Sequence, residues 1–512
     1  TSITTSDPGF SGVDARNHLQ QHNAGTGDYT TTQFSLEPPD QGLCTDGTDV
    51  METVNNALAE YDANGNVIEP AAAMRQFFHL APEIDRRAAP AYVYGPFISD
   101  PRCYYDSSTS RWFVSELEFG VDPSTDAYTG DANELVAVSQ TSDPTGGYNL
   151  YQFDVRDDGT QGTPSHPGCP CFGDQPLLGV DAYGAYISTN EYPLFNAGFN
   201  GAQVYGMSKG LLESGAGTVP LVHFQGGDIP DGQYPGGASY SIQPAEVPTS
   251  NFDTANGGTE DFLSGTEFTG YVDNRIITWA MTNTSDLATD PSALSFSHTI
   301  TTSETYGMGG DFNFGVKQNS GPRPLEKSLP GQNSVPEEIA ANDDRMNQVV
   351  YADGLLWSAV NTATVNQNGV QGIGVAYFIV NPETSSIENQ GYVSVNGGTD
   401  VFFPSIGVND RGNGVMGFSL SGPSYYPSTA YVNVGVNGVS SPIHLGAAGQ
   451  LPDDGFSGYP AEGGAGIGRW GDYSAAIADP SGKSIWLANE YIPNDPRTQL
   501  ANWGTFISNV NL

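Results

Sequence analysis

A stretch near the C-terminus occurs twice in this chain, and the repeat constrains the fold more than any other feature of the sequence. Residues 471–491 read GDYSAAIADPSGKSIWLANEY, and residues 173–192 read GDQPLLGVDAYGAYISTNEY. Each copy predicts a short strand, a polar turn at Asp479 or Asp181, and a second strand that ends in Asn-Glu-Tyr. Because nearly three hundred residues separate the copies, reuse of one structural unit explains them better than a chance match.

The same strand–turn–strand pattern recurs from about residue 37 onward. The intervals between successive turns are 60, 75, 92, 80, 56 and 70 residues, each enough for a four-stranded antiparallel sheet and its loops. We therefore predict an all-β protein: a seven-bladed β-propeller of four-stranded antiparallel blades around a central channel. The turns are centred on Asp46, Asp106, Asp181, Asp273, Asp353, Asn409 and Asp479.

The propeller is predicted to span residues 37–512 as a single domain, and residues 1–36 to form an extended N-terminal arm. Residues 504–512 predict a last strand that closes the ring beside the first blade. The composition agrees, since 64 Gly, 35 Pro, 26 Tyr and 24 Phe suit many short strands and tight turns. Only residues 71–80 predict a short helix.

The charge and hydropathy of the chain exclude several kinds of partner. There are 58 acidic and 17 basic residues, and the formal net charge is −41 at pH 7. Phosphate binding needs clustered Lys and Arg, so we expect no nucleic acid partner and no attachment to an anionic membrane. No run of about 18 apolar residues is present, so membrane insertion is not expected either.

The start of the chain and its cysteines predict a secreted, extracellular protein. The chain begins at Thr1 rather than Met, as expected after removal of a signal peptide. Its four Cys allow two disulfides in an oxidising compartment. We expect a monomer.

The loop His166-Pro-Gly-Cys169-Pro-Cys171 has two interpretations, a soft metal site or a disulfide. Cys44 and Cys103 lie at similar depths in the first strands of adjacent blades. One bridge between them and another involving Cys169 and Cys171 is one of three possible pairings. We favour disulfides and assign no metal ligands. His166 remains a candidate proton donor or acceptor.

A functional site is predicted at one mouth of the channel. In a propeller blade the first strand starts at the face where the second strand ends. The first residues of first strands and the last residues of second strands therefore gather at one face. This rule also places Asp40 and Asp100 at the mouth. The candidate catalytic residues are Asp174, Glu191, Asp472, Glu490, His166, Tyr192 and Tyr491, and the candidate substrate-binding residues are Arg102, Arg345, Arg469 and Asn361.

The chemistry of these residues suits acid–base catalysis on an acidic substrate. Crowded carboxylates raise one another's pKa, so that one stays protonated near neutral pH, and Arg clamps an acidic group with two parallel bonds. The structural interpretation is that such carboxylates bond neighbouring backbone amides or hold a structural cation such as Ca²⁺. The sequence does not identify a cofactor.

The pattern at the mouth resembles secreted β-propellers that process sugars, namely sialidase-like hydrolases and propeller-fold polysaccharide lyases. The residues that carry this distant resemblance are Arg102, Arg345, Arg469, the Glu-Tyr pairs at 191–192 and 490–491, and the turn DPSGKSIW at 479–486, which is similar to the sialidase aspartate box. The whole chain also resembles uncharacterised secreted bacterial propellers.

The resemblance implies an enzyme that cleaves an acidic extracellular polysaccharide or glycan. In this interpretation Asp174 or Asp472 acts as acid and base. Glu191 or Glu490 is the partner carboxylate or activates the adjacent tyrosine. The three arginines hold the acidic group. The alternatives are a non-catalytic extracellular module that binds glycans or proteins at the same mouth, and a redox metalloenzyme.

Overall fold

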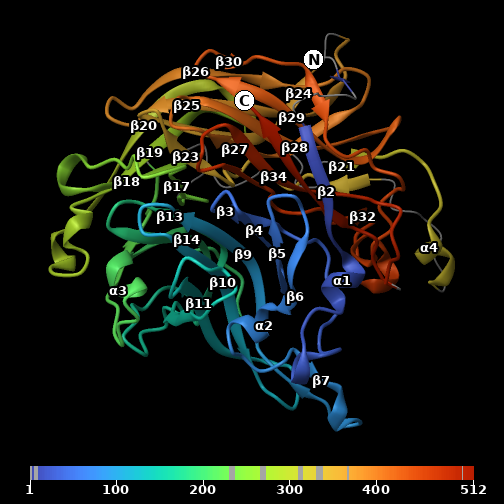
Figure 1. The fold of residues 1–512 in the computed structure, drawn as a ribbon, viewed down its shortest axis with the longest axis horizontal. Coiled ribbons are helices and arrows are strands. Elements are labelled where there is room, and N and C mark those ends of the chain that lie inside the picture. The colour runs from blue at the N-terminus through green and yellow to red at the C-terminus, as the bar shows by residue number, and fades with distance from the viewer. Residues whose placement is uncertain are drawn as a thin grey trace.

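The structure is a computed structural model that describes residues 3–4, 10–229, 237–265, 272–308, 315–329, 338–365, 368–498 and 500–512. As predicted, the protein is all-β (Figure 1). The described α-helices are four or five residues long: α1 (His18–His22), α2 (Met74–Phe77), α3 (Lys209–Glu213) and α4 (Pro324–Ser328). The helix predicted at 71–80 is therefore present but shorter, because strand β6 (Val67–Ala73) takes its first residues.

Three sheets each contain four antiparallel strands that are consecutive in the chain. The first is β3 (Gly42–Thr45), β4 (Asp49–Val54), β5 (Ala57–Asp62) and β6. The second is β9 (Phe97–Asp106), β10 (Arg111–Val121), β11 (Tyr128–Ser139) and β12 (Tyr148–Asp154). The third is β13 (Cys171–Val180), β14 (Gly184–Pro193), β15 (Ala202–Ser208) and β16 (Leu221–Gln225).

An eight-stranded sheet consists of two further antiparallel groups of four, joined by a short parallel pairing of β17 with β23. One group is β17 (Gln243–Glu246), β18 (Thr259–Gly265), β19 (Val272–Thr282) and β20 (Ser295–Gly307). The other is β23 (Val349–Ala352), β24 (Leu355–Val365), β25 (Gln371–Asn381) and β26 (Ser386–Val393).

The remaining large sheets both include a strand from the N-terminal region. One contains β27 (Asp400–Val408), β28 (Asn413–Gly422), β29 (Tyr425–Gly435), β30 (Gly438–Val439), β31 (Ile443–Leu445) and β1 (Ile3–Thr4). The other contains β33 (Ala475–Ala478), β34 (Ser484–Tyr491), β35 (Gly504–Asn511) and β2 (Phe10–Asn17). Short strands form two small sheets: β21 (Gly315–Lys317), β22 (Glu338–Ala340) and β32 (Ile467–Gly468), and β7 (Ile84–Asp85) with β8 (Val93–Tyr94).

Among the described residues, the first strands of the groups of consecutive strands contact one another in a closed circuit. The order of contact is β3, β9, β13, β17, β23, β27, β33 and back to β3. Both chain ends contribute to the last sheet, because β35 lies between β34 and the N-terminal strand β2. The last strand therefore pairs within its own group, and part of the region predicted as an extended arm forms the fourth strand of that sheet.

The repeated turns have a common local cause. The side chains of Asp46, Asp106, Asp181, Asn409 and Asp479 each accept a hydrogen bond from the backbone amide two residues further on, at 2.8 to 3.0 Å. This contact mimics a backbone turn, which explains why Asp or Asn recurs between the first and second strands.

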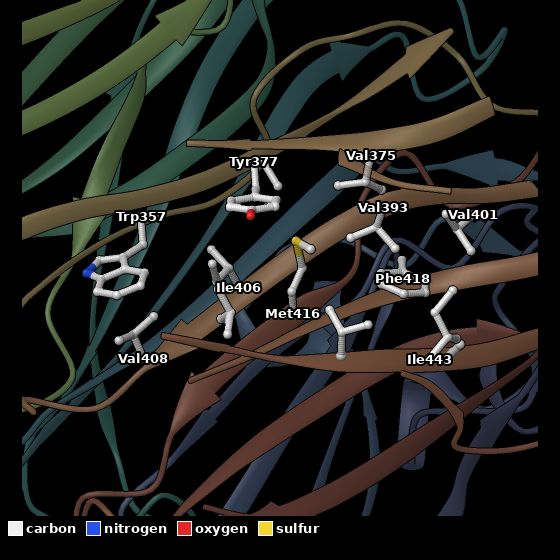
Figure 2. Close-up of a cluster of buried hydrophobic side chains, with 14 of the residues drawn as sticks. Trp357, Val375, Tyr377, Val393, Val401, Ile406, Val408, Met416, Phe418 and Ile443 are labelled. Atoms are coloured by element: carbon white, nitrogen blue, oxygen red, sulfur yellow. The ribbon is translucent and has the colours of Figure 1, made fainter. Parts of the chain in front are cut away.

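Hydrophobic side chains fill the space between neighbouring sheets. Figure 2 shows one such cluster, in which Trp357 and Tyr377 from the β23–β26 group pack with Ile406, Met416 and Phe418 from the next sheet. In several strands the side chains on both faces are buried, as in β27, where every residue from Asp400 to Val408 is buried. Such burial fixes the positions of the polar strand ends.

Both predicted disulfides are present, one joining Cys44 to Cys103 and one joining Cys169 to Cys171. The first bridge links β3 to β9 and thus two neighbouring sheets. The second joins Cys169, in the loop before β13, to Cys171, the first residue of that strand. Among the described residues, no helix has the length and apolar character needed to cross a membrane.

Candidate functional site

Four aspartates gather near the beginnings of β3, β9, β13 and β33. They are Asp40, Asp100, Asp174 and Asp472, and we call them, together with Arg345, Arg469 and Tyr192, the mouth cluster. Burial raises the pKa of Asp40 well above its usual range, and the charges of Asp472 and Asp100 raise it further. The starts of these strands therefore place the aspartates close enough for their charges to act on one another.

Two of the four aspartates accept hydrogen bonds from backbone amides. Asp40 Oδ1 accepts the backbone N–H of Asp472 at 2.6 Å, and Asp100 Oδ2 accepts the backbone N–H of Gln175 at 3.1 Å. Both are at least nine-tenths buried, and both have positive φ, 53° and 60°. These contacts fit the structural interpretation, in which carboxylates join neighbouring first strands.

Asp174 differs from its neighbours. Its side chain is partly exposed, and no hydrogen-bond donor among the described residues contacts its carboxyl group. Burial raises the pKa of Asp174 to about 7, the charge of Asp100 also raises it, and Arg345 opposes the shift. A carboxyl group of this kind exchanges its proton near neutral pH, as a general acid or base requires.

Asp472 and Arg469 form the exposed side of the mouth cluster. Arg469 Nη2 lies 2.8 Å from Asp472 Oδ2, and the arginine side chain is 54% exposed. Asn342 Nδ2 donates to the other carboxylate oxygen at 3.4 Å. Arg469 thus keeps N–H groups that face solvent and can bind an anion.

Arg345 is held firmly beside Asp174. Its Nε and Nη2 donate to the two carboxylate oxygens of Asp343 at 2.8 and 2.7 Å, and its guanidinium lies 5.0 Å from the ring centroid of Tyr240. Burial raises the pKa of Tyr192 above its ordinary value, while the charge of Arg345 lowers it and that of Asp174 raises it. Tyr192 therefore lies near Asp174 and Arg345 within the cluster.

Two candidate substrate-binding residues are buried and do not belong to the exposed side formed by Asp472 and Arg469. Arg102 is 4% exposed, and its guanidinium carbon lies 3.6 Å from the ring centroid of Tyr473. Asn361 bonds the backbone with both ends of its amide. Its Nδ2 donates to the carbonyls of Ala341 and Asp343 at 2.7 and 3.1 Å, and its Oδ1 accepts from the amide of Phe403 at 2.6 Å.

The Glu-Tyr pair of the last sheet is also inside the protein. Glu490 is 3% exposed, and its Oε2 accepts the backbone N–H of Gly471 at 2.7 Å. Burial raises the pKa of Glu490 well above its usual range. Tyr491 packs edge-on against Phe506, with ring centroids 5.8 Å apart.

Glu191 and His166 belong to a separate polar cluster. His166 Nδ1 lies 2.8 Å from Glu191 Oε1 and 3.3 Å from Asp157 Oδ2. Asn200 Nδ2 donates to Glu191 Oε1 at 2.8 Å. Successive residues of a strand point to opposite faces of the sheet, which explains why Glu191 meets His166 while Tyr192 reaches the mouth cluster.

The carboxyl groups of this second cluster are close enough to repel each other. Burial and, after it, the adjacent Glu191 raise the pKa of Asp157 to about 9, while the charge of His166 opposes the shift. Asp157 and Asn200 were not among the sequence-based candidates. Both lie in loops, and the sequence offered no period or motif to indicate that they meet Glu191.

The comparisons with known proteins assign no family. No protein-family model matches the chain, and no curated protein sequence matches it. Similar solved structures include a sialidase from Trypanosoma rangeli in complex with sialic acid, with 8% identity, a TM-score of 0.32, and coverage of 84% of this chain and 56% of that one. This chain thus matches only about half the length of the sialidase.

Two other similar structures are covered almost completely. A protein of unknown function from Dyadobacter fermentans has 9% identity and a TM-score of 0.34, with 81% of this chain and 95% of that chain covered. An α-L-arabinofuranosidase from Fusarium graminearum has 12% identity and a TM-score of 0.33, with 80% and 92% covered. All three likenesses are distant, and they assign no activity to this chain.

Proposed function

We propose that this chain is a secreted hydrolase that cleaves an acidic glycan at the mouth cluster. The observation that carries the proposal is the partly exposed carboxyl group of Asp174, whose pKa burial raises to about 7, next to the ion pair between Asp472 and Arg469. A protonated carboxyl beside an ionised one is the arrangement that hydrolysis of a glycosidic bond needs.

The fold in this proposal is a seven-bladed propeller of four-stranded blades. The closed circuit of first strands from β3 to β33 supports it, as does the four-strand order within the groups. The starts of these strands would then surround one mouth of a central channel, and Asp174 and Asp472 would lie at its rim.

The residues would divide the work as follows. The carboxyl group of Asp174 donates its proton to the glycosidic oxygen as the bond to the anomeric carbon breaks. The carboxylate of Asp472 takes a proton from water, whose oxygen bonds to the anomeric carbon. Arg469 binds the acidic group of the sugar through its exposed N–H groups, and Tyr192 and Arg345 line the site.

The proposed location is outside the cell. The two disulfides support this, because such bonds persist in oxidising compartments.

The proposal that the substrate is acidic depends on Arg469 alone, since Arg345 is fully engaged by its neighbours and Arg102 is buried. Both mouth arginines are already paired with aspartates. This observation favours a neutral glycan as the second candidate substrate.

Release of reducing ends from a panel of uronic acid, sialic acid and neutral polysaccharides tests the proposal. The wild-type chain should cleave one acidic polymer, and Asp174→Asn should lower kcat by about 100-fold or more. Asp158→Asn is the matched control because Asp158 is a half-buried loop carboxylate that bonds Thr160, and it should retain full activity.

Three outcomes would contradict the proposed reaction. Unsaturated products would indicate a lyase. Binding without turnover, unchanged in Asp174→Asn, would indicate a non-catalytic module. Full activity in Asp174→Asn would place the chemistry elsewhere in the protein.

A further inference from the structure

Three ligand-type side chains converge away from the mouth cluster. One oxygen or nitrogen each from Asp157, His166 and Glu191 lie within 4.8 Å of one another. The side chains of Asp157, His166 and Glu191 are 1%, 7% and 2% exposed. Oδ2 of Asp157 has no hydrogen-bond partner among the described residues, and it lies 3.3 Å from His166 Nδ1.

We propose that Asp157, His166 and Glu191 bind a zinc ion that fastens the loop between β12 and β13 to the end of β14. A buried imidazole with two carboxylates is a suitable zinc donor set. Bonds of about 2.0–2.2 Å in a tetrahedral site separate neighbouring ligand atoms by roughly 3.3 Å. The observed separations of 3.3 Å and 2.8 Å from His166 Nδ1 need little adjustment to reach this spacing.

The surroundings of the three ligands also fit a bound metal. Metal-ligating carboxylates and imidazoles are usually held by further hydrogen bonds. Asn200 Nδ2 donates to Glu191 Oε1 at 2.8 Å. The side-chain nitrogen of Gln225 contacts His166 Nε2. With this amide turned over, its oxygen would accept the Nε2–H when Nδ1 binds the metal.

The loop that carries two of the ligands is already folded around them. The backbone N–H of His166 donates to the carbonyl of Asp157 at 2.8 Å, and the backbone N–H of Cys171 donates to the carbonyl of Arg156 at 2.8 Å. Asp157 has a positive φ of 47°. The donor set favours zinc over calcium, because calcium takes six to eight oxygen ligands.

The two cysteines of the nearby disulfide offer a competing zinc site when they are reduced. Cys169, Cys171 and Glu191 also lie within reach of a common point, and reduced cysteines are strong zinc ligands. In the structure the two sulfur atoms are bonded to each other. The proposal therefore uses the oxidised protein, in which the nitrogen and oxygen ligands bind the metal without the sulfurs.

The test is zinc binding to metal-stripped protein under non-reducing conditions. The expected results are one zinc per chain by elemental analysis after dialysis, and a rise in the thermal midpoint of the wild-type protein on zinc addition. His166→Gln and Asp157→Asn should each lower zinc affinity at least about tenfold and remove the thermal shift.

Asp158→Asn is the matched control, since it changes the neighbouring carboxylate, which bonds Thr160 outside the cluster. It should bind zinc as the wild type does, and so should the double variant Cys169→Ser/Cys171→Ser. Loss of zinc in the double variant, or unchanged zinc binding in a folded His166→Gln protein, would overturn the proposal. Absence of zinc binding by the wild-type protein would also overturn the proposal, and this result can be interpreted without any variant.

Discussion

The Oδ1 atom of Asn55 accepts the backbone N–H of Asp100 at 2.9 Å and thereby joins the end of one second strand to the first strand of the next sheet. Its Nδ2 donates to Asp40 Oδ2, also at 2.9 Å. The same contact recurs twice. Asn190 Oδ1 accepts the backbone N–H of Ser241 at 2.8 Å, and Asn361 Oδ1 accepts that of Phe403 at 2.6 Å.

In each case the amide that is bonded belongs to a residue with positive φ, between 47° and 60°. Few residues other than glycine adopt such a conformation without support. The asparagine supplies that support and fixes the first strand of the next sheet. The Asn55 contact thereby holds Asp40 and Asp100 of the mouth cluster in place.

Replacing Asn55 with Ala should therefore lower the free energy of unfolding. The variant leaves the buried amide of Asp100 without its acceptor and removes a donor from Asp40, and the expected loss is about 1–3 kcal/mol. Urea denaturation measures it. Asn196→Ala is the control, because Asn196 is exposed and makes one bond to a loop carbonyl, and its loss should stay below about 0.5 kcal/mol.

Stability should fall as pH rises from 4 toward 8. Burial raises the pKa of Asp174 to about 7 from an unfolded value of 3.8, so the folded chain binds more protons than the unfolded chain between these values. The stabilisation is fully present below pH 3.8 and is lost as pH passes through 7. Asp40 and Glu134, whose pKa values burial also raises, act in the same direction.

The test compares wild type with Asp174→Asn at pH 5 and pH 8 by urea denaturation. The variant cannot ionise at this position. Its free energy of unfolding should therefore fall less between pH 5 and pH 8 than that of the wild type, and the two falls should differ by about 1 kcal/mol. An equal fall in both proteins would show that Asp174 does not titrate in this range.

The two disulfides should contribute unequally to stability. Cys44 and Cys103 are 59 residues apart, whereas Cys169 and Cys171 are separated by two. Because a longer closed loop restricts the unfolded chain more, Cys44→Ala/Cys103→Ala should cost about 4 kcal/mol and Cys169→Ala/Cys171→Ala much less. Denaturation under non-reducing conditions measures both, and an equal cost would contradict the chain-entropy argument.

Removal of the N-terminal strand should destabilise the last sheet. A chain that begins at His18 lacks β2, so the outer edge of β35 loses its antiparallel partner. An unpaired edge favours association with other chains, so lower unfolding free energy and aggregation are expected. A chain that begins at Phe10 keeps β2 and is the control. If the two truncated chains were equally stable, β2 would contribute nothing to the closure.

The sequence predicted the parts of this fold that depend on local patterns. The Asp or Asn turns at Asp181 and Asp479 could be recognised because the side chain bonds an amide two residues away. Strand starts and ends could be aligned from those turns. In the structure Arg469 pairs with Asp472, and the charges of both act on Asp174.

Other parts depended on contacts that no local pattern records. The pairing of β2 with β35 joins residues almost five hundred positions apart. The meeting of Asp157 with Glu191 depends on the path of a loop. The opposite directions of Glu191 and Tyr192 could have been predicted, because neighbouring residues of a strand face opposite sides.

The pH dependence of glycan cleavage tests the central claim most directly, because it reports the protonation of Asp174 during catalysis. The account predicts that kcat/KM of the wild type falls with a midpoint near pH 7, as the acid loses its proton. The charge of Arg469 lowers the pKa of Asp174, so Arg469→Gln should move the falling limb to higher pH. A wild-type profile without a falling limb near pH 7, or one that Arg469→Gln leaves in place, would contradict the assignment of Asp174 as the acid.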